Sequence, residues 1–116
     1  MKYKMNLNNG PFNRIKDGTK TIELRLNDEK RQLLKEKDLI EFTNRKTLEN
    51  LVVEIVGLYK YLNFEELYKD FYKISIGYDE DDVADPKDME QYYSKEEQNK
   101  YGVIGIKIRV LTDSRW

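Results

Sequence analysis

Apolar and polar residues alternate over several short stretches of this chain, and the alternation predicts about five β-strands. The stretches are residues 2–7, 20–26, 39–43, 50–61 and 102–111. The fourth is long and largely apolar, and a glycine within it, Gly57, is a position where a bulge or bend is expected. The last stretch carries apolar residues on both of its sides, so we expect it to be at least partly buried on both faces.

Short helices are predicted between these strands from their end signals. Pro11 follows a turn at a first helical position, and Gly18 is expected to end that helix in a left-handed conformation. Asn63 and Ser94 each precede a glutamate by three residues, a spacing that is typical of helix N-caps. Residues 29–34 also predict a short helix. Because long helices do not alternate with the strands, we expect a small curled or barrel-like α+β domain.

The chain has 116 residues, which fits one domain spanning residues 1–116, and 37% of them are charged. It contains no cysteine and no histidine, so a disulfide framework and a thiolate site are excluded. Histidine, which is both the usual general base and the commonest transition-metal ligand, is missing. We therefore predict no metal and no cofactor, and any catalysis would have to use Lys, Asp, Glu, Tyr, Ser or Thr.

No apolar run approaches membrane-spanning length, and the first residues lack the apolar segment of a signal peptide, so a cytoplasmic protein without a membrane partner is expected. The net charge is −1, but its distribution is uneven. Residues 1–50 hold 12 Lys and Arg against 8 Asp and Glu, whereas residues 51–116 hold 9 against 14. Two interpretations stay open: a basic groove that nucleic acid could occupy, or an accidental distribution of surface charge.

The predicted strand at residues 20–26 carries the most informative side chains of the chain. Glu23 and Arg25 share one face of it, and Lys20 lies at its start beside the glycine turn. Charges this dense on an otherwise apolar strand favour a cleft for a ligand that bears a phosphate or a base. Arginine can grip a phosphate with two hydrogen bonds and lysine as a point charge. The alternative is a surface Glu23–Arg25 ion pair, worth less than about 1 kcal/mol.

Catalysis on the same strand is a second possibility. A lysine held in a pocket can act as a base or nucleophile, and a nearby glutamate can hold or exchange its proton, so Lys20 and Glu23 are candidate catalytic residues with Thr21 as a further one. Arg31 could extend a basic rim, or it could simply be solvated. Tyr93 is the best candidate for stacking on an unpaired base, although tyrosines also serve as core-edge residues.

The acidic segment at residues 79–85 invites a metal interpretation. It lacks the alternating aspartates and the late glutamate of a calcium loop, so we expect an exposed loop there.

The sequence of this chain closely resembles the ASCH domain family. The resemblance spans nearly the whole chain, and its most specific part is the core Gly18-x-Lys20-x-x-Glu23-x-Arg25; further matching segments are Asp28-Glu-Lys-Arg, Phe64-Glu-Glu-Leu67 and Tyr101-Gly-Val-Ile-Gly-Ile106. It implies a fold similar to the PUA domain, a small β-barrel with flanking helices. It also implies RNA binding in a cleft beside the core motif.

For some small bacterial members the resemblance implies hydrolysis of the acetyl amide of acetylated cytidine. Their catalytic lysine falls on Lys20, but their threonine nucleophile falls on Glu23, a departure that weakens the hydrolase interpretation unless Thr21 or a water takes over. Their third residue, a glutamate, is to be sought near residues 77–82. The family's usual glycine before Asp38 is Lys37 here, a change that we expect to alter only a turn.

We therefore predict an RNA- or nucleotide-binding protein whose ligand is held by Lys20, Thr21, Glu23 and Arg25, with Arg31 and Tyr93 beside them. A modified nucleoside is a further possible ligand. The alternative is an amidohydrolase-like or ribonuclease-like enzyme that uses Lys20 and Glu23. Binding is favoured because a lysine and a glutamate so close together should neutralise one another as reactants. The oligomeric state stays open between monomer and dimer.

Overall fold

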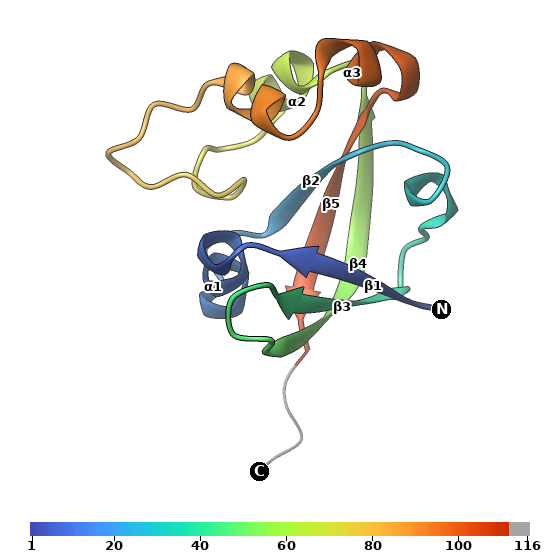
Figure 1. Cartoon of the computed structure of the whole chain (residues 1–116), viewed down its shortest axis with the longest axis vertical. Helices are drawn as coiled ribbons and strands as arrows, with labels where there is room; N and C mark the ends of the chain where they lie inside the picture. Colours follow the sequence, from blue (N-terminus) through green and yellow to red (C-terminus); the bar gives the residue numbers. More distant parts are fainter. Residues whose placement is uncertain (112–116) are drawn as a thin grey trace.

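A computed structural model describes residues 1–111 as a curled half-barrel sheet of five strands with short helices around it (Figure 1). This confirms the predicted α+β class; the last residues of the predicted domain, 112–116, lie outside the described range. None of the described helices is long and apolar enough to cross a membrane. The elements are β1 (Lys2–Leu7), α1 (Asn9–Asp17), β2 (Ile22–Leu26), the 3₁₀ turn η1 (Arg31–Leu33), β3 (Leu39–Asn44), β4 (Asn50–Tyr61), α2 (Phe64–Asp70), the 3₁₀ turn η2 (Pro86–Gln91), α3 (Lys95–Tyr101) and β5 (Val103–Val110).

The strands lie in the order β1-β3-β4-β5-β2, so β1 and β2 form the two edges of the sheet. β1 pairs in parallel with β3, and the other neighbours are antiparallel. The register of β4 shifts between Ile55 and Gly57, which confirms the predicted bulge and adds twist. Because the sheet curls, Arg25 of β2 can donate a 3.0 Å hydrogen bond from Nη2 to the carbonyl oxygen of Asn6 in β1.

The start of β2 differs from the prediction. The strand was expected from Lys20, but it begins at Ile22. The backbone N–H of Lys20 donates to the carbonyl of Arg14, and those of Thr21 and Ile22 both donate to the carbonyl of Ser75. The residues before Ile22 are therefore held by the end of α1 and by a later loop, which the local pattern could not reveal.

The helix expected at residues 29–34 is also shorter than predicted, a single 3₁₀ turn at Arg31–Leu33. Its hydrogen bonds close over three residues, from the N–H of Leu34 to the carbonyl of Arg31. The helix expected to begin at Pro11 begins earlier, at Asn9, so Pro11 is its third residue. The glycine and cap signals are confirmed. Gly18 has a φ of 89° after α1, and the side chain of Asn63 accepts from the N–H of Glu66. At α3, Ser94 and Glu97 form a reciprocal capping box.

Two groups of buried apolar residues hold the fold together. The first joins β1, β3, β4 and β5 to α1 and is centred on Phe12, Ile40 and Phe42. The second joins β2 to α2 and to the start of β5, and it includes Leu24, Phe64 and Ile76. The strand that carries the candidate site thus has its apolar face in the second group, leaving its opposite face for polar side chains.

Candidate ligand-binding cavity

A cavity of about 640 Å³ lies where the two apolar groups meet, with Leu7 from the first and Leu24 and Ile76 from the second in its wall. Its volume lies in the range of small-molecule sites. The wall is built from β1, α1, β2, the turn after β3, α2 and residues 76–93. Its charged and aromatic members are Arg14, Lys20, Glu23, Arg25, Arg45, Asp88, Tyr68, Tyr78, Tyr92 and Tyr93.

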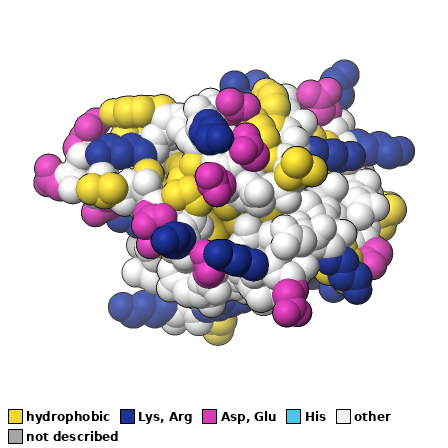
Figure 2. Space-filling view, turned by 90° about the horizontal axis from the view of Figure 1, so that it is seen from above, with side chains coloured by type: hydrophobic (Ala, Val, Ile, Leu, Met, Phe, Trp, Pro, Cys, Tyr) yellow, Lys and Arg dark blue, Asp and Glu magenta, His cyan; other side chains and the backbone are white. Residues whose placement is uncertain are grey.

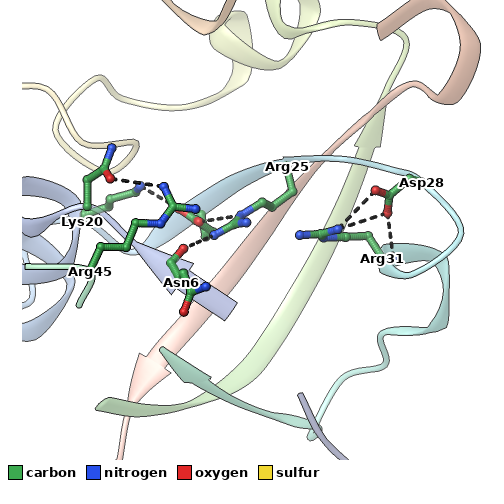
Figure 3. A network of polar contacts seen from close by, with 8 residues as sticks. Asn6, Lys20, Arg25, Asp28, Arg31 and Arg45 are labelled. Carbon is green, nitrogen blue, oxygen red and sulfur yellow. Dashed lines mark hydrogen bonds and ion pairs between the residues drawn. The ribbon is translucent and has the colours of Figure 1, made fainter. Parts of the chain in front are cut away.

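Lys20, Glu23 and Arg25 converge in this cavity as a buried ion triad. Lys20 Nζ lies 2.7 Å from Oε1 of Glu23, and Arg25 Nε lies 2.8 Å from Oε2. Lys20 is 7% exposed and Glu23 3% exposed. Figure 3 shows Lys20 and Arg25 reaching toward one another from opposite sides of this network. Both oxygens of the glutamate are therefore engaged by a cation, and the triad carries one net positive charge.

Burial by itself would raise the pKa of Glu23, but the charges of Lys20 and Arg25 and their hydrogen bonds outweigh it and lower that pKa to about 2. For Arg25, burial by itself would lower the pKa, and the charge of Glu23 reverses this and raises it. The glutamate is thus a stable anion at neutral pH. In this state it holds two cations in place.

A glycine holds the stem of Lys20 from the other side. Gly77 has a φ of 112°, and a Cβ there would lie 3.3 Å from Cδ of Lys20. A side chain at this position would therefore be strained and would press on the lysine. Because the neighbouring Ser75 carbonyl binds the start of β2, the 75–77 segment fixes both the backbone and the side chain of the lysine.

Two arginines in the cavity wall were missed by the sequence interpretation. Arg14 comes from α1 and pairs with Asp79 at 3.1 Å, and Arg45 comes from the turn after β3 and donates to Oδ1 of Asn8 at 3.2 Å. Within residues 1–111, Arg45 has no carboxylate at ion-pair distance. No local pattern marks either residue. Arg14 lies on α1, whose end is hydrogen-bonded to Lys20, and Arg45 follows β3, a strand that does not pair with β2. The wall holds four cations against two carboxylates, so it is net positive.

Tyr93, the residue predicted to stack on a base, lies in the cavity wall. Its ring stacks on Phe64, with centroids 6.0 Å apart and an interplanar angle of 24°. Burial raises the pKa of its hydroxyl, although the nearby charge of Arg25 acts in the opposite direction. Tyr92 lies beside it at 6.5 Å and is 54% exposed. A planar ligand entering the cavity would therefore meet aromatic surface next to Arg25.

Thr21 and Arg31 are not brought into the cavity wall. Thr21 is tied to the Ser75 carbonyl, and Arg31 pairs with Asp28 at 3.2 Å on the far side of Arg25 (Figure 3). In the 77–82 region, Gly77 and Tyr78 line the cavity, but no carboxylate of that region does. The carboxylate that does line it, apart from Glu23, is Asp88, which sequence reasoning did not select. Within residues 1–111, no cluster of His, Cys, Asp and Glu could hold a metal.

The uneven charge of the two halves of the chain does not appear as one large basic patch on the helical end. Seen from that end, Lys and Arg side chains are interspersed with Asp and Glu, with hydrophobic surface between them (Figure 2). The cavity wall, in contrast, has more cations than carboxylates.

A family model described as ASCH domain matches residues 5–112. The chain is similar to the crystal structure of hypothetical protein PH0355, from Pyrococcus, with 32% identity over 96% of this chain and 100% of that one and a TM-score of 0.81. It is also similar to the solution structure of protein PF0455 from Pyrococcus furiosus, with 30% identity over 97% and 100% and a TM-score of 0.70. No curated protein matches.

Proposed function

This chain belongs to the ASCH domain family, and from that premise we propose that it binds RNA or a nucleotide in the cavity lined by Lys20, Glu23 and Arg25. Members of the family are generally RNA-binding, with a PUA-like fold. We further propose that residues 1–116 act as one domain. The single observation that supports binding most strongly is the buried ion triad in a net positive, tyrosine-lined cavity.

The roles of the residues follow from their contacts. Lys20 and Arg25 have donors beyond those engaged by Glu23, so they can bind a phosphate oxygen or a base carbonyl. Arg14 and Arg45 add two further cations for the phosphates of a strand that enters the cavity. Tyr93 and the exposed Tyr92 offer rings for a base to stack on. Arg31, outside the cavity, would contact only a longer RNA along the rim.

A hydrolase on the same cavity is the alternative, because Lys20 and Glu23 are in contact there. Two features make it the weaker proposal. A glutamate with a pKa of about 2 is a poor general base at neutral pH. Thr21, whose hydroxyl is the nearest in sequence to Glu23, does not line the cavity. Incubation with N4-acetylcytidine tests it: we expect no release of acetate. Release by the parent protein that is abolished in Lys20→Met would favour the hydrolase.

Binding is tested with a short single-stranded RNA in a salt series, read by fluorescence anisotropy. Arg45→Gln should weaken binding several-fold and lower the slope of log K against log salt by about 0.7, the loss expected for one phosphate contact. Lys46→Gln removes the same charge from the next residue, which does not line the cavity, and is the matched control. Equal effects of the two substitutions, or no RNA binding by the parent protein, would contradict the proposal.

A further inference from the structure

The two sides of the cavity differ in the hydrogen bonds that they can offer to a ligand. On the β2 side, Lys20 and Arg25 carry donors only, and each carboxylate oxygen of Glu23 already accepts from one of them. That side is therefore suited to the acceptor atoms of a ligand, such as a phosphate oxygen, a ring nitrogen or a carbonyl.

Another part of the cavity wall is formed by Asp88 of η2 and by Tyr68 and Tyr78. The Tyr78 hydroxyl donates to Oδ2 of Asp88 at 2.7 Å and also lies 3.2 Å from the carbonyl of Asp85. Both of these partners only accept, so the single proton of Tyr78 is committed to them.

The direction of the next hydrogen bond follows from this. The hydroxyls of Tyr68 and Tyr78 are 2.9 Å apart. Since the Tyr78 proton is committed, Tyr68 must donate to Tyr78, which leaves the Tyr68 oxygen as an acceptor. Oδ1 of Asp88 accepts no hydrogen bond from residues 1–111, and it is an acceptor too. Burial, together with the hydrogen bonds to Tyr68 and Asp88, raises the pKa of Tyr78, so its hydroxyl keeps its proton.

We propose that this acceptor side reads the amino group of a nucleobase, so that the cavity selects amino-bearing bases such as cytosine and adenine over uracil and hypoxanthine. This inference rests on the proposed function and names its ligand class. An amino group can donate to Asp88 while ring or carbonyl acceptors of the same ligand face Lys20 or Arg25. A carbonyl in the same place would meet the lone pairs of Asp88 and Tyr68 without any donor, which is unfavourable. Asp88 determines specificity, and Tyr78 positions it.

The test uses two nucleotide pairs, CMP with UMP and AMP with IMP. Within each pair an amino group is replaced by a carbonyl and the adjacent ring nitrogen changes from an acceptor to an N–H donor, so the Asp88 variant is needed to assign the preference to the amino group. Isothermal titration calorimetry should give a preference of roughly tenfold for the amino-bearing member in each pair. Asp88→Asn should reduce it to within about twofold, because an amide can turn its NH₂ toward a carbonyl. Asp81→Asn, an exposed acid outside the cavity wall, is the matched control and should keep the full preference.

Tyr78→Phe should also lower the preference, because Asp88 loses the hydroxyl that orients it. A merely structural role would weaken all four nucleotides equally, whereas a positioning role lowers the affinity for CMP and AMP and leaves that for UMP and IMP unchanged. If the parent protein binds CMP and UMP equally, the inference is overturned while the proposed function stands. If it binds neither nucleotides nor single-stranded RNA, the proposed function is overturned and this inference with it.

Discussion

The Lys20–Glu23–Arg25 triad and the Asp28–Arg31 pair come from neighbouring stretches with a similar density of charge, yet they end in different surroundings (Figure 3). The side chains of the triad are 8%, 4% and 12% exposed, whereas those of Arg31 and Asp28 are 19% and 26% exposed. The pair closes locally over one 3₁₀ turn. The triad is enclosed by β1, α1 and the 75–77 segment, which come from distant parts of the chain.

The difference teaches that the charge pattern of the sequence does not distinguish a cation in a buried triad from one in a local ion pair. An ion pair that keeps contact with water is worth little, because solvent screens it and the side chains lose entropy. A buried group with two cations around one anion is different: it is tolerated only while the charges stay matched. Removing a partner should therefore be far more costly in the triad than in the pair.

The largest expected effect comes from Glu23→Gln, which leaves two buried cations without their anion. We expect a loss of about 3–5 kcal/mol in the free energy of unfolding, measured by urea denaturation. Asp28→Asn removes the same charge from the half-buried pair, which keeps contact with water, and should cost clearly less. Similar losses in the two variants would show that the triad is screened by solvent like the pair.

The pH dependence of stability should sharpen the same contrast. The pKa of Glu23 falls from an ordinary 4.5 to about 2 in the folded protein, so the folded state favours the anion. Its contribution is fully present above about pH 4.5 and is lost as the pH falls toward 2, because the unfolded chain then takes up the proton first. The loss amounts to about 3 kcal/mol.

Urea denaturation of the parent and of Glu23→Gln between pH 6 and pH 2 measures this contribution as the difference between the two stability curves. The curves should converge as the pH falls. The stability curve of Asp28→Asn, compared in the same way, should stay nearly parallel to the curve of the parent. Curves for Glu23→Gln that stay equally far apart down to pH 2 would mean that the carboxylate is not held by its cations.

The comparison of the triad with the pair also shows which features of the structure could be predicted from the sequence. Alternating apolar residues, Gly18 and the helix caps located most elements, since these signals act within a few residues. The face of Glu23 and Arg25 followed from strand periodicity. Arg14, Arg45 and Asp88 could not be found in this way, because they come from α1, the turn after β3 and η2, which strand periodicity does not relate to β2. The local alternation also extended the strand back to Lys20, whose backbone is bound to α1.

Gly77 tests whether packing on the lysine stem contributes to the triad. Gly77→Ala introduces a side chain at a φ of 112° and 3.3 Å from Lys20 Cδ, so it should cost about 1–3 kcal/mol in unfolding free energy and weaken RNA binding. Gly18→Ala is the matched control: its φ is 89°, but nothing lies within 4 Å of the added carbon. It should lose stability from strain alone and keep its affinity for RNA. If the two variants bound RNA with equal affinity, the packing of Gly77 against Lys20 would not contribute to the ligand site.

The smallest effect is expected at Arg31, and it decides where the site ends. Arg31 pairs with Asp28 outside the cavity wall, so Arg31→Gln should cost less than about 1 kcal/mol in unfolding free energy. Its affinity for CMP should stay within about twofold of the parent, because one nucleotide fits in the cavity and does not need to reach η1. Arg45→Gln, measured in the same calorimetric titration, should weaken CMP binding clearly more, since Arg45 lines the cavity and is proposed to bind the phosphate. If Arg31→Gln weakens CMP binding as much as Arg45→Gln does, the binding site includes the turn at η1 and the Asp28–Arg31 pair is part of it.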